Sequence, residues 1–163
     1  MSFSTCDFCD AHKADASGAF RVLPAGMRSY GGQSSFSGQI VTIKCYEDNS
    51  LVKAAVEGPG QGRVLVIDGA GSLQRALLGG NLAAAAAKNG WAGIVIAGCV
   101  RDLAELRAAA VCILALGHVP MPTERKGQGQ GDLPVQVMGV WVRPGDWLYA
   151  DDDGVVISAT PLV

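Results

Sequence analysis

The sequence lacks several features that would each assign it to a class of protein. No apolar run approaches the roughly 18 residues that a membrane-spanning helix requires, because Lys88 and Arg101 flank the longest candidate. Residues 1–13 contain no basic segment followed by an apolar one, so we expect no signal peptide. Lys and Arg form no block and the net charge is −2, which argues against nucleic acid or a membrane as a partner.

Charged residues and cysteines are also few. Charged residues make up 17% of the 163 residues, below the usual share of about a quarter. Such a composition leaves more apolar surface than a small domain hides by itself, and it favours a homo-oligomer. The 5 cysteines lie mostly beside apolar segments, which is typical of reduced thiols and predicts a cytoplasmic protein. The length predicts a single domain over residues 1–163.

Apolar periodicity predicts strands that alternate with helices in the middle of the chain. Strands are expected at 39–47 (half-buried), 63–68, 93–98 and 111–117, with a less certain strand at 72–78. Helices are expected at 6–13, 51–58, 81–89 and 102–109. Residues 120–134 predict a long polar loop, and 136–158 predict short strands joined by turns. The pattern indicates a mixed α/β layered domain rather than a doubly wound sheet.

Cys6, Cys9 and His12 suggest a metal or redox site near the N-terminus. Structural zinc usually needs four ligands, however, and the sequence has no second pair of neighbouring cysteines. A redox Cys-x-x-Cys typically follows a strand, whereas Asp7 and Asp10 border this one. We interpret the segment as a helix with two half-buried thiols, and zinc or redox chemistry stays as the alternative.

Two other stretches favour a structural interpretation. Residues 67–72, IDGAGS, follow a predicted strand, but Gln74 stands where a dinucleotide-binding loop has its third glycine. Residues 151–154, DDDG, could ligate a metal, but the pattern favours a charged hairpin turn. No serine, histidine or lysine lies in a pattern typical of a catalytic nucleophile.

Two glycines open a predicted helix in the middle of the chain. Gly79 and Gly80 precede Asn81, where the helix of residues 81–89 begins. The first turn of a helix leaves N–H groups without partners at the positive end of the helix dipole, which favours a carboxylate or phosphate ligand. Glycine also lets a ligand approach the backbone closely. The segment is a candidate anion site, although many helices simply begin after glycine.

Arg101 and Asp102 follow the buried strand of residues 93–98. The planar guanidinium suits a carboxylate and stays protonated at any working pH. Asp102 permits two interpretations: it caps the helix that follows, or it holds a hard divalent cation with waters completing the shell. We expect this helix and the one opened by Gly79 to begin on the same edge. Amides, a guanidinium and a carboxylate would then converge on one small anion, such as a 2-oxo acid.

Four stretches carry a family resemblance, and they run in order through nearly the whole chain: GGQSSFSGQIVTIKCYEDN, GRVLVIDGAGSLQRALLGGNLA, NGWAGIVIAGCVRD and PGDWLYADDDGVVIS. With them the sequence resembles the family of the regulator of ribonuclease E activity A and the class II 4-hydroxy-4-methyl-2-oxoglutarate aldolases. The resemblance implies a layered ββα fold of the swivelling-domain type, assembled as a ring-shaped homotrimer. In lyase members the substrate lies between subunits, on a segment that matches Gly79, Gly80, Asn81 and Leu82.

The resemblance also implies the catalytic pair. The family's substrate arginine falls on Arg101 and its metal-binding aspartate on Asp102, while Glu105 closes the family's Arg-Asp-x-x-acid pattern. Asp102 would anchor Mg²⁺ or Mn²⁺ against the 1-carboxylate and 2-oxo oxygen, and Arg101 would stabilise the enolate formed when a carbon–carbon bond breaks. The expected substrates are 4-hydroxy-4-methyl-2-oxoglutarate, 4-carboxy-4-hydroxy-2-oxoadipate and oxaloacetate.

Two positions depart from the family's lyase pattern. Many lyase members carry an aspartate where this chain has Gly80, and many have a longer C-terminal segment that supplies an acidic group, whereas this chain stops at Val163. Both groups serve proton transfer in aldol cleavage. Decarboxylation of oxaloacetate needs only an electron sink at the carbonyl, which a metal and Arg101 supply.

A function of a different class is compatible with the same fold. It is a non-enzymatic regulator that binds ribonuclease E and masks it through protein contacts. The intact pair of Arg101 and Asp102 favours the lyase, because a binding module has no evident need for it. Gly80 and the short C-terminus favour the regulator. We therefore expect a lyase, with the regulator as the alternative.

Overall fold

One long strand joins the two halves of the fold. The computed structural model describes residues 2–163, and in it β3 (Phe36–Lys44) pairs with a different neighbour along each half of its length. Its first half pairs antiparallel with β11 (Trp147–Asp151), and its second half pairs parallel with β4 (Val64–Asp68). The chain therefore forms one 10-stranded sheet that is antiparallel on one side of β3 and largely parallel on the other.

The strand order in this sheet is β1-β12-β11-β3-β4-β6-β7-β2, with β5 paired to β6 and β8 paired to β3. The remaining strands of this sheet are β1 (Phe20–Val22), β2 (Arg28–Ser29), β5 (Ala76–Leu78), β6 (Gly93–Val100), β7 (Cys112–His118), β8 (Gln130–Gly131) and β12 (Gly154–Ser158). A separate ribbon contains β9 (Val135–Val137) and β10 (Val140–Val142). The helices are α1 (Thr5–His12), α2 (Ser50–Glu57), α3 (Gly80–Lys88) and α4 (Leu103–Ala108).

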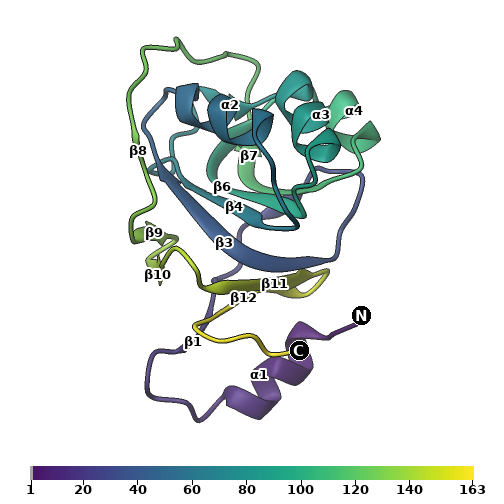
Figure 1. The fold of residues 1–163 in the computed structure, drawn as a ribbon, viewed down its shortest axis with the longest axis vertical. Helices are drawn as coiled ribbons and strands as arrows, with labels where there is room; N and C mark the ends of the chain where they lie inside the picture. The colour runs from purple at the N-terminus through teal and green to yellow at the C-terminus, as the bar shows by residue number, and fades with distance from the viewer. Residues whose placement is uncertain (1) are drawn as a thin grey trace.

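The elements form layers (Figure 1). Helices α2, α3 and α4 cover one face of the parallel strands, and the β11–β12 hairpin lies on the opposite side of β3. Helix α1 packs beyond that hairpin, near both chain termini. The mixed α/β layered fold predicted from the sequence is thus confirmed. None of the helices in residues 2–163 is long and apolar enough to cross a membrane.

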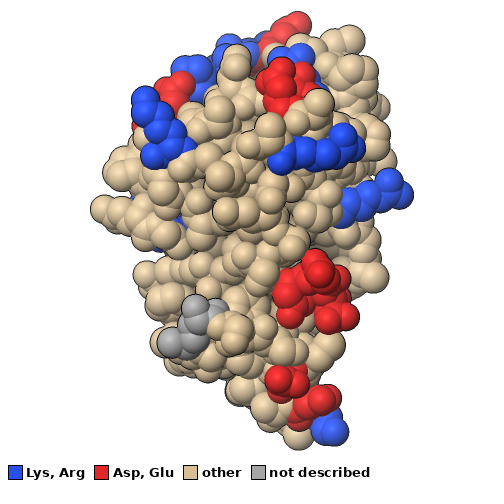
Figure 2. Space-filling view, turned by 90° about the vertical axis from the view of Figure 1, so that its right-hand side faces the viewer, with Lys and Arg blue, Asp and Glu red and all other residues tan. Residues whose placement is uncertain are grey.

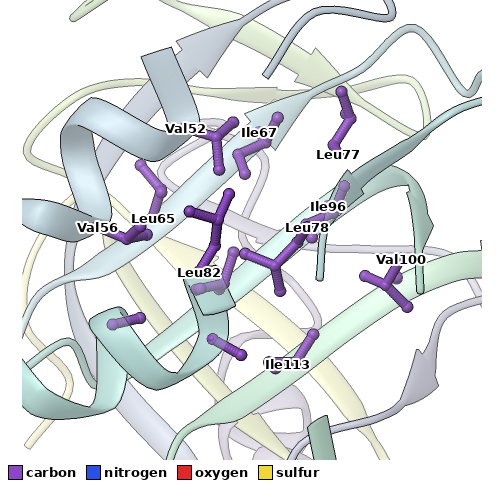
Figure 3. Close-up of a cluster of buried hydrophobic side chains, with 14 of the residues drawn as sticks. Val52, Val56, Leu65, Ile67, Leu77, Leu78, Leu82, Ile96, Val100 and Ile113 are labelled. Carbon is purple, nitrogen blue, oxygen red and sulfur yellow. The ribbon is translucent and has the colours of Figure 1, made fainter. Parts of the chain in front are cut away.

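The larger apolar core lies between the helices and the parallel strands (Figure 3). Val52 and Val56 of α2 and Leu82 of α3 point onto this face of the sheet, against residues such as Leu65 and Ile67 of β4. A side chain of this size stabilises the fold by roughly 1.5–3 kcal/mol when it is fully buried. A second core, which includes Ile40, Val66 and Leu148, fills the other face of the sheet. Both faces of β4 are therefore buried against apolar side chains, which explains its uninterrupted apolar sequence.

The structure corrects the expectation of a half-buried strand at 39–47. Ile40, Thr42 and Ile43 are all buried, although they point to both faces of β3. The helices cover one face and the ribbon and hairpin approach the other, so neither is left to solvent. The hydroxyl of Thr42 is satisfied because it donates to Leu133 O at 2.6 Å.

Three short strands were not predicted from the sequence, and one was predicted too long. Strands β1, β2 and β8 have two or three residues each, too few to show a periodic pattern, and each forms only by pairing with a distant strand. Strand β5 covers only Ala76–Leu78 of the expected 72–78, because the residues before it form a turn after β4. The helices begin and end within about two residues of their predicted limits.

Candidate active site at the edge of the parallel strands

The parallel pairing of β5 and β6 brings two helix starts together. Strand β5 ends at Leu78 and strand β6 ends at Val100, and these two residues are paired in the sheet. Arg101 N donates to Leu78 O at 2.9 Å, so the two chain segments leave the sheet side by side. Helices α3 and α4 therefore open on the same edge, as the sequence predicted. The amides in the first turn of α3 at Asn81 and Leu82 have no partners within the helix.

Asp102 does not cap its own helix. Its backbone is left-handed (φ 61°, ψ 51°), and its side chain makes no capping hydrogen bond in α4. The carboxylate instead turns to the neighbouring helix, where its Oδ2 accepts from Gly80 N at 2.9 Å. The left-handed conformation is costly for a residue other than glycine, and such strain is common at functional sites. The capping interpretation of Asp102 is therefore wrong for this structure.

A cleft of about 350 Å³ lies in front of these two helix starts. It brings together all of the substrate- and metal-binding residues proposed from the sequence, which are Gly79, Gly80, Asn81, Leu82, Arg101 and Asp102. A second wall contains Asn49, Pro122, Thr123 and Arg125, none of which the sequence suggested. They belong to the start of α2 and to the long loop after β7, far from the glycines in sequence.

Asn49 fixes this second wall. It is buried, and its side-chain N–H donates to Leu77 O at 3.1 Å. Its side-chain oxygen accepts from Thr123 Oγ1 at 2.8 Å and from Arg125 Nε at 3.0 Å. An asparagine just before a helix is an ordinary capping residue, so the sequence gives no sign of this role. In the structure it makes no capping bond and ties the long loop to the sheet.

Asp48 holds the next part of the same loop. One of its carboxylate oxygens accepts from the backbone and hydroxyl of Ser50, and the other accepts from Lys126 N and Gln128 N. Burial of the Asp48 carboxylate raises its pKa, but these hydrogen bonds outweigh it and lower the pKa to about 2. The loop is thus fastened by a group that stays ionised at neutral pH.

The backbone of Gly80 is covered by Glu105. A Cβ atom added at Gly80 would overlap the Glu105 carboxylate and would lie 2.6 Å from Cδ and 2.8 Å from Cβ of that side chain. Gly79 is similarly crowded, since a Cβ there would lie 2.7 Å from Asp102 Oδ2. The aspartate that many lyase members have at the position of Gly80 therefore does not fit while Glu105 keeps this position.

The donor set suits a hard divalent cation held mainly by water. Asp102 is exposed at the cleft, and its Oδ1 accepts no hydrogen bond from residues 2–163. Within the same range no three His, Cys, Asp or Glu side chains gather as a metal cage. Magnesium is commonly bound by one or two carboxylates together with substrate and several waters. Asp102 as the single protein carboxylate fits that pattern.

The other candidate stretches have structural roles in the fold. Cys6 and Cys9 lie in α1, and His12 Nδ1 donates to Phe8 O at 2.9 Å while its ring stacks on Phe20. Residues 69–72 form a turn after β4. In the DDDG hairpin, Asp151 accepts from the amide and hydroxyl of Thr5 at 2.8 and 2.6 Å, which fastens α1 to β11.

Charge is unevenly distributed over the surface. Figure 2 shows one side of the molecule, on which Lys and Arg lie mostly in the upper half together with some acidic side chains, while the charged side chains of the lower half are mostly acidic. The upper half contains the three helices that border the cleft. The protein is acidic overall, but the cleft itself is lined by two arginines and one aspartate. The cleft is therefore suited to an anion.

Comparisons with known proteins agree with the fold and differ in the names they supply. A model of the family described as RraA-like, Aldolase/RraA, matches residues 5–157. A protein of Albidiferax ferrireducens, provisionally named a 4-hydroxy-4-methyl-2-oxoglutarate aldolase, is 63% identical and aligns over 99% of this chain and 98% of its own length.

Two solved structures are similar over almost their whole length. The RNA-processing inhibitor RraA from Thermus thermophilis has a TM-score of 0.93 and 42% identity, covering 100% of this chain and 96% of that one. A structure from Geobacillus kaustophilus, described as an S-adenosylmethionine:2-dimethylmenaquinone methyltransferase, has a TM-score of 0.89 and 41% identity, covering 98% and 97%. These relatives are named for three different functions, so the function of this chain has to be argued from the geometry of the site.

Proposed function

This chain belongs to the RraA-like family, and we propose that it is a divalent-metal-dependent lyase acting on pyruvate-type 2-oxo acids. Its reactions are decarboxylation of oxaloacetate and aldol cleavage of 4-hydroxy-4-methyl-2-oxoglutarate or 4-carboxy-4-hydroxy-2-oxoadipate. The names of relatives at 55–63% identity support a lyase. The observation that carries the proposal is the convergence of the α3 start, Arg101 and Asp102 on one cleft.

Different residues of the cleft bind different parts of the substrate. The amides at the start of α3 and the helix dipole attract the 1-carboxylate of the substrate. Gly79 and Gly80 have no side chains, which leaves room beside them for Asp102 and Glu105, and the amides of Asn81 and Leu82 are the ones that remain for the substrate. Asp102 would hold the cation, Mg²⁺ or Mn²⁺, and its Oδ2 accepts from Gly80 N. The cation would act as a Lewis acid toward the 2-oxo group.

Arg101 stabilises the negative charge that develops on the substrate. In oxaloacetate the C3–C4 bond breaks, its electron pair moves to C2–C3 and the 2-oxo oxygen, and carbon dioxide leaves. A guanidinium placed at that oxygen lowers the energy of the transition state more than that of the ground state. A proton from water then adds to C3 and gives pyruvate. This sequence needs no group at Gly80, where Glu105 leaves no space for an aspartate.

A direct assay tests the proposal. Purified protein with Mg²⁺ is mixed with oxaloacetate, and pyruvate release is followed above the rate given by Mg²⁺ alone. We expect saturable turnover that chelation abolishes and that added Mg²⁺ or Mn²⁺ restores. Turnover that is unchanged by chelation would exclude the metal, and no turnover with either oxaloacetate or the two aldol substrates would exclude the lyase.

The regulator of ribonuclease E is the second candidate, and the Thermus structure named as an RNA-processing inhibitor favours it. The protein would then lower cleavage of a model RNA by ribonuclease E without binding the RNA. If Asp102→Asn inhibits as well as the wild-type protein, regulation and chemistry use separate surfaces. If stoichiometric wild-type protein does not inhibit at all, the regulator is excluded.

We also propose a homotrimer. Several large apolar side chains remain mostly exposed in the single chain, among them Tyr46 at 65%, Leu73 at 61% and Met121 at 51%. Met121 directly precedes Pro122 in the wall of the cleft, so a second copy that covers this region would also close the site. Sedimentation equilibrium at micromolar concentration should give three times the chain mass, and a monomer would contradict a site shared between subunits.

A further inference from the structure

Arg125 is a positively charged group of the cleft that the proposed chemistry does not use. It lies in the long loop after β7, and it lines the same cleft as Arg101 and the start of α3. The 2-oxo group and the 1-carboxylate of a substrate already have partners at Arg101, Asp102 and the α3 amides. The second guanidinium of the cleft is therefore available to a second anionic group on the ligand.

The structure holds Arg125 in place while leaving its binding edge open. Its Nε donates to the side-chain oxygen of Asn49 at 3.0 Å, and Asn49 is itself buried and bonded to Leu77 O. Within residues 2–163 the two terminal nitrogens of Arg125 donate to no acceptor, and the group forms no ion pair. Its neighbour Glu124 pairs with Lys126 instead.

A guanidinium fixed through Nε presents its terminal N–H groups as a fork for a carboxylate. Such bidentate, charge-assisted bonds are among the stronger polar contacts in proteins. Arginine side chains lose considerable conformational freedom when they bind a ligand, and the bond to Asn49 restricts this side chain before binding occurs. Thr123 Oγ1 donates to the same oxygen of Asn49, and this second bond also ties the loop to the sheet.

We propose that Arg125 is the specificity-determining residue for the distal carboxylate, so that the cleft selects dicarboxylic 2-oxo acids over monocarboxylic ones. This inference rests on the proposed function, whose substrates all carry a carboxylate beyond the 2-oxo acid unit. Asn49 is the positioning residue that aims Arg125. The cleft volume of about 350 Å³ is at the lower end of small-molecule sites and fits a compact dicarboxylate.

The chemistry predicts how Arg125 affects each kinetic constant. In decarboxylation the distal carboxylate loses its negative charge as it becomes carbon dioxide. Arg125 therefore binds the ground state at least as tightly as the transition state, and its loss raises KM without lowering kcat. Pyruvate, which has no distal carboxylate, does not reach Arg125 and should bind equally well with or without it.

The experiment compares Arg125→Met and Arg125→Lys with the wild-type protein in the presence of Mg²⁺. Arg143→Met is the matched control, because Arg143 is an exposed arginine of the turn before β11, outside the cleft. We expect Arg125→Met to raise KM for oxaloacetate by about 10- to 100-fold, the range of a lost hydrogen bond to a charged group. Its kcat should not fall, and its inhibition constant for pyruvate should stay unchanged. Arg125→Lys should have an intermediate KM, and the control should match the wild type.

Other outcomes overturn the inference. An unchanged KM in Arg125→Met would show that Arg125 does not bind substrate. A parallel rise in KM for oxaloacetate and in the inhibition constant for pyruvate would show that the substitution damages the shared part of the cleft rather than a distal subsite.

A binding measurement keeps this inference separate from the lyase proposal. Calorimetric titration with 2-oxoglutarate, which has a distal carboxylate but cannot lose it by the same route, is compared with titration with pyruvate. Wild-type protein should bind 2-oxoglutarate more tightly, and Arg125→Met should lose that preference. If the wild-type protein shows no turnover but has this preference, the lyase fails and the subsite stands. If it shows no preference, the subsite fails whatever the turnover.

Discussion

Asp102 and Asp151 show how two regions of this protein use the same residue differently. Asp151 ends β11, and both of its carboxylate oxygens accept hydrogen bonds from Thr5, with a further one from Asp153 N. Asp102 follows β6, and among residues 2–163 only one of its oxygens is hydrogen-bonded. An aspartate whose acceptors are all satisfied contributes to stability, whereas one with an oxygen free in a cleft is available to a ligand. The predictions below test this difference.

The largest effect is expected for Asp102→Asn. Asparagine can still accept from Gly80 N, so the fold and the melting temperature should stay near those of the wild type. The negative charge that attracts the cation is lost, and pyruvate formation should fall by orders of magnitude. Asp151→Asn should do the opposite, keeping activity while lowering stability by about 1–3 kcal/mol, because partly buried hydrogen bonds to the charge are lost. Equal turnover in Asp102→Asn and wild type would refute the metal role.

Arg101→Lys should remove most activity while the protein stays folded. Lysine keeps the positive charge but has no planar fork, so a bidentate contact to a carboxylate or enolate weakens. If Arg101 acts in the transition state, kcat suffers at least as much as KM. Steady-state kinetics give kcat and KM, and a thermal melt shows whether the protein stays folded. A lysine variant with full activity would show that only the charge matters at this position.

Gly80→Ala should cost about 1–3 kcal/mol of stability, the usual penalty for overpacking, because the new methyl group overlaps Glu105. Activity should fall as the start of α3 shifts. Glu105→Ala in the same chain removes the carboxylate that causes the overlap and should restore part of the stability. Gly131→Ala is the control, since its methyl group would meet no atom closer than 3.8 Å. Urea unfolding of the four proteins gives the comparison.

The Asp48 carboxylate should make stability depend on pH. Its pKa is lowered in the folded protein to about 2, below the value of about 3.9 of an unperturbed aspartate. Its contribution is therefore complete above about pH 4 and is lost as the pH falls toward 2. Asp48→Asn should lose the contribution at neutral pH and show a shallower decline in acid. Unfolding by urea between pH 7 and pH 2 measures the difference. Identical stability curves for the wild type and Asp48→Asn would show that the Asp48 carboxylate does not stabilise the loop.

The smallest effect is expected for Cys6→Ser combined with Cys9→Ser. The negative charge of Asp153 raises the pKa of the Cys6 thiol, and burial raises that of Cys9, so both thiols are poor nucleophiles and poor metal ligands. Activity, metal content and melting temperature should stay unchanged. Loss of stoichiometric zinc from the double variant would show that α1 carries a metal site after all.

Some elements could be predicted from the sequence because their pattern is strong on its own. Strand β6 is buried along its whole length, so an unbroken apolar run was enough to find it. Helix α1 begins after Ser4, whose side chain accepts from Asp7 N as a capping residue does. Strand β2 has only two residues and exists because Arg28 and Ser29 pair with β7. No local pattern marks such a strand.

The sequence by itself determined the first wall of the cleft. Gly79, Gly80, Arg101 and Asp102 each follow an apolar strand, and parallel strands bring their ends to one edge, so local signals were sufficient to place them together. The second wall was decided only by the tertiary structure. Asn49, Thr123 and Arg125 lie in polar segments with no periodicity, and they reach the cleft because one buried asparagine bonds to both of the others. The orientation of the Asp102 carboxylate was decided in the same way, since its hydrogen-bond partner is the amide of Gly80 on another helix.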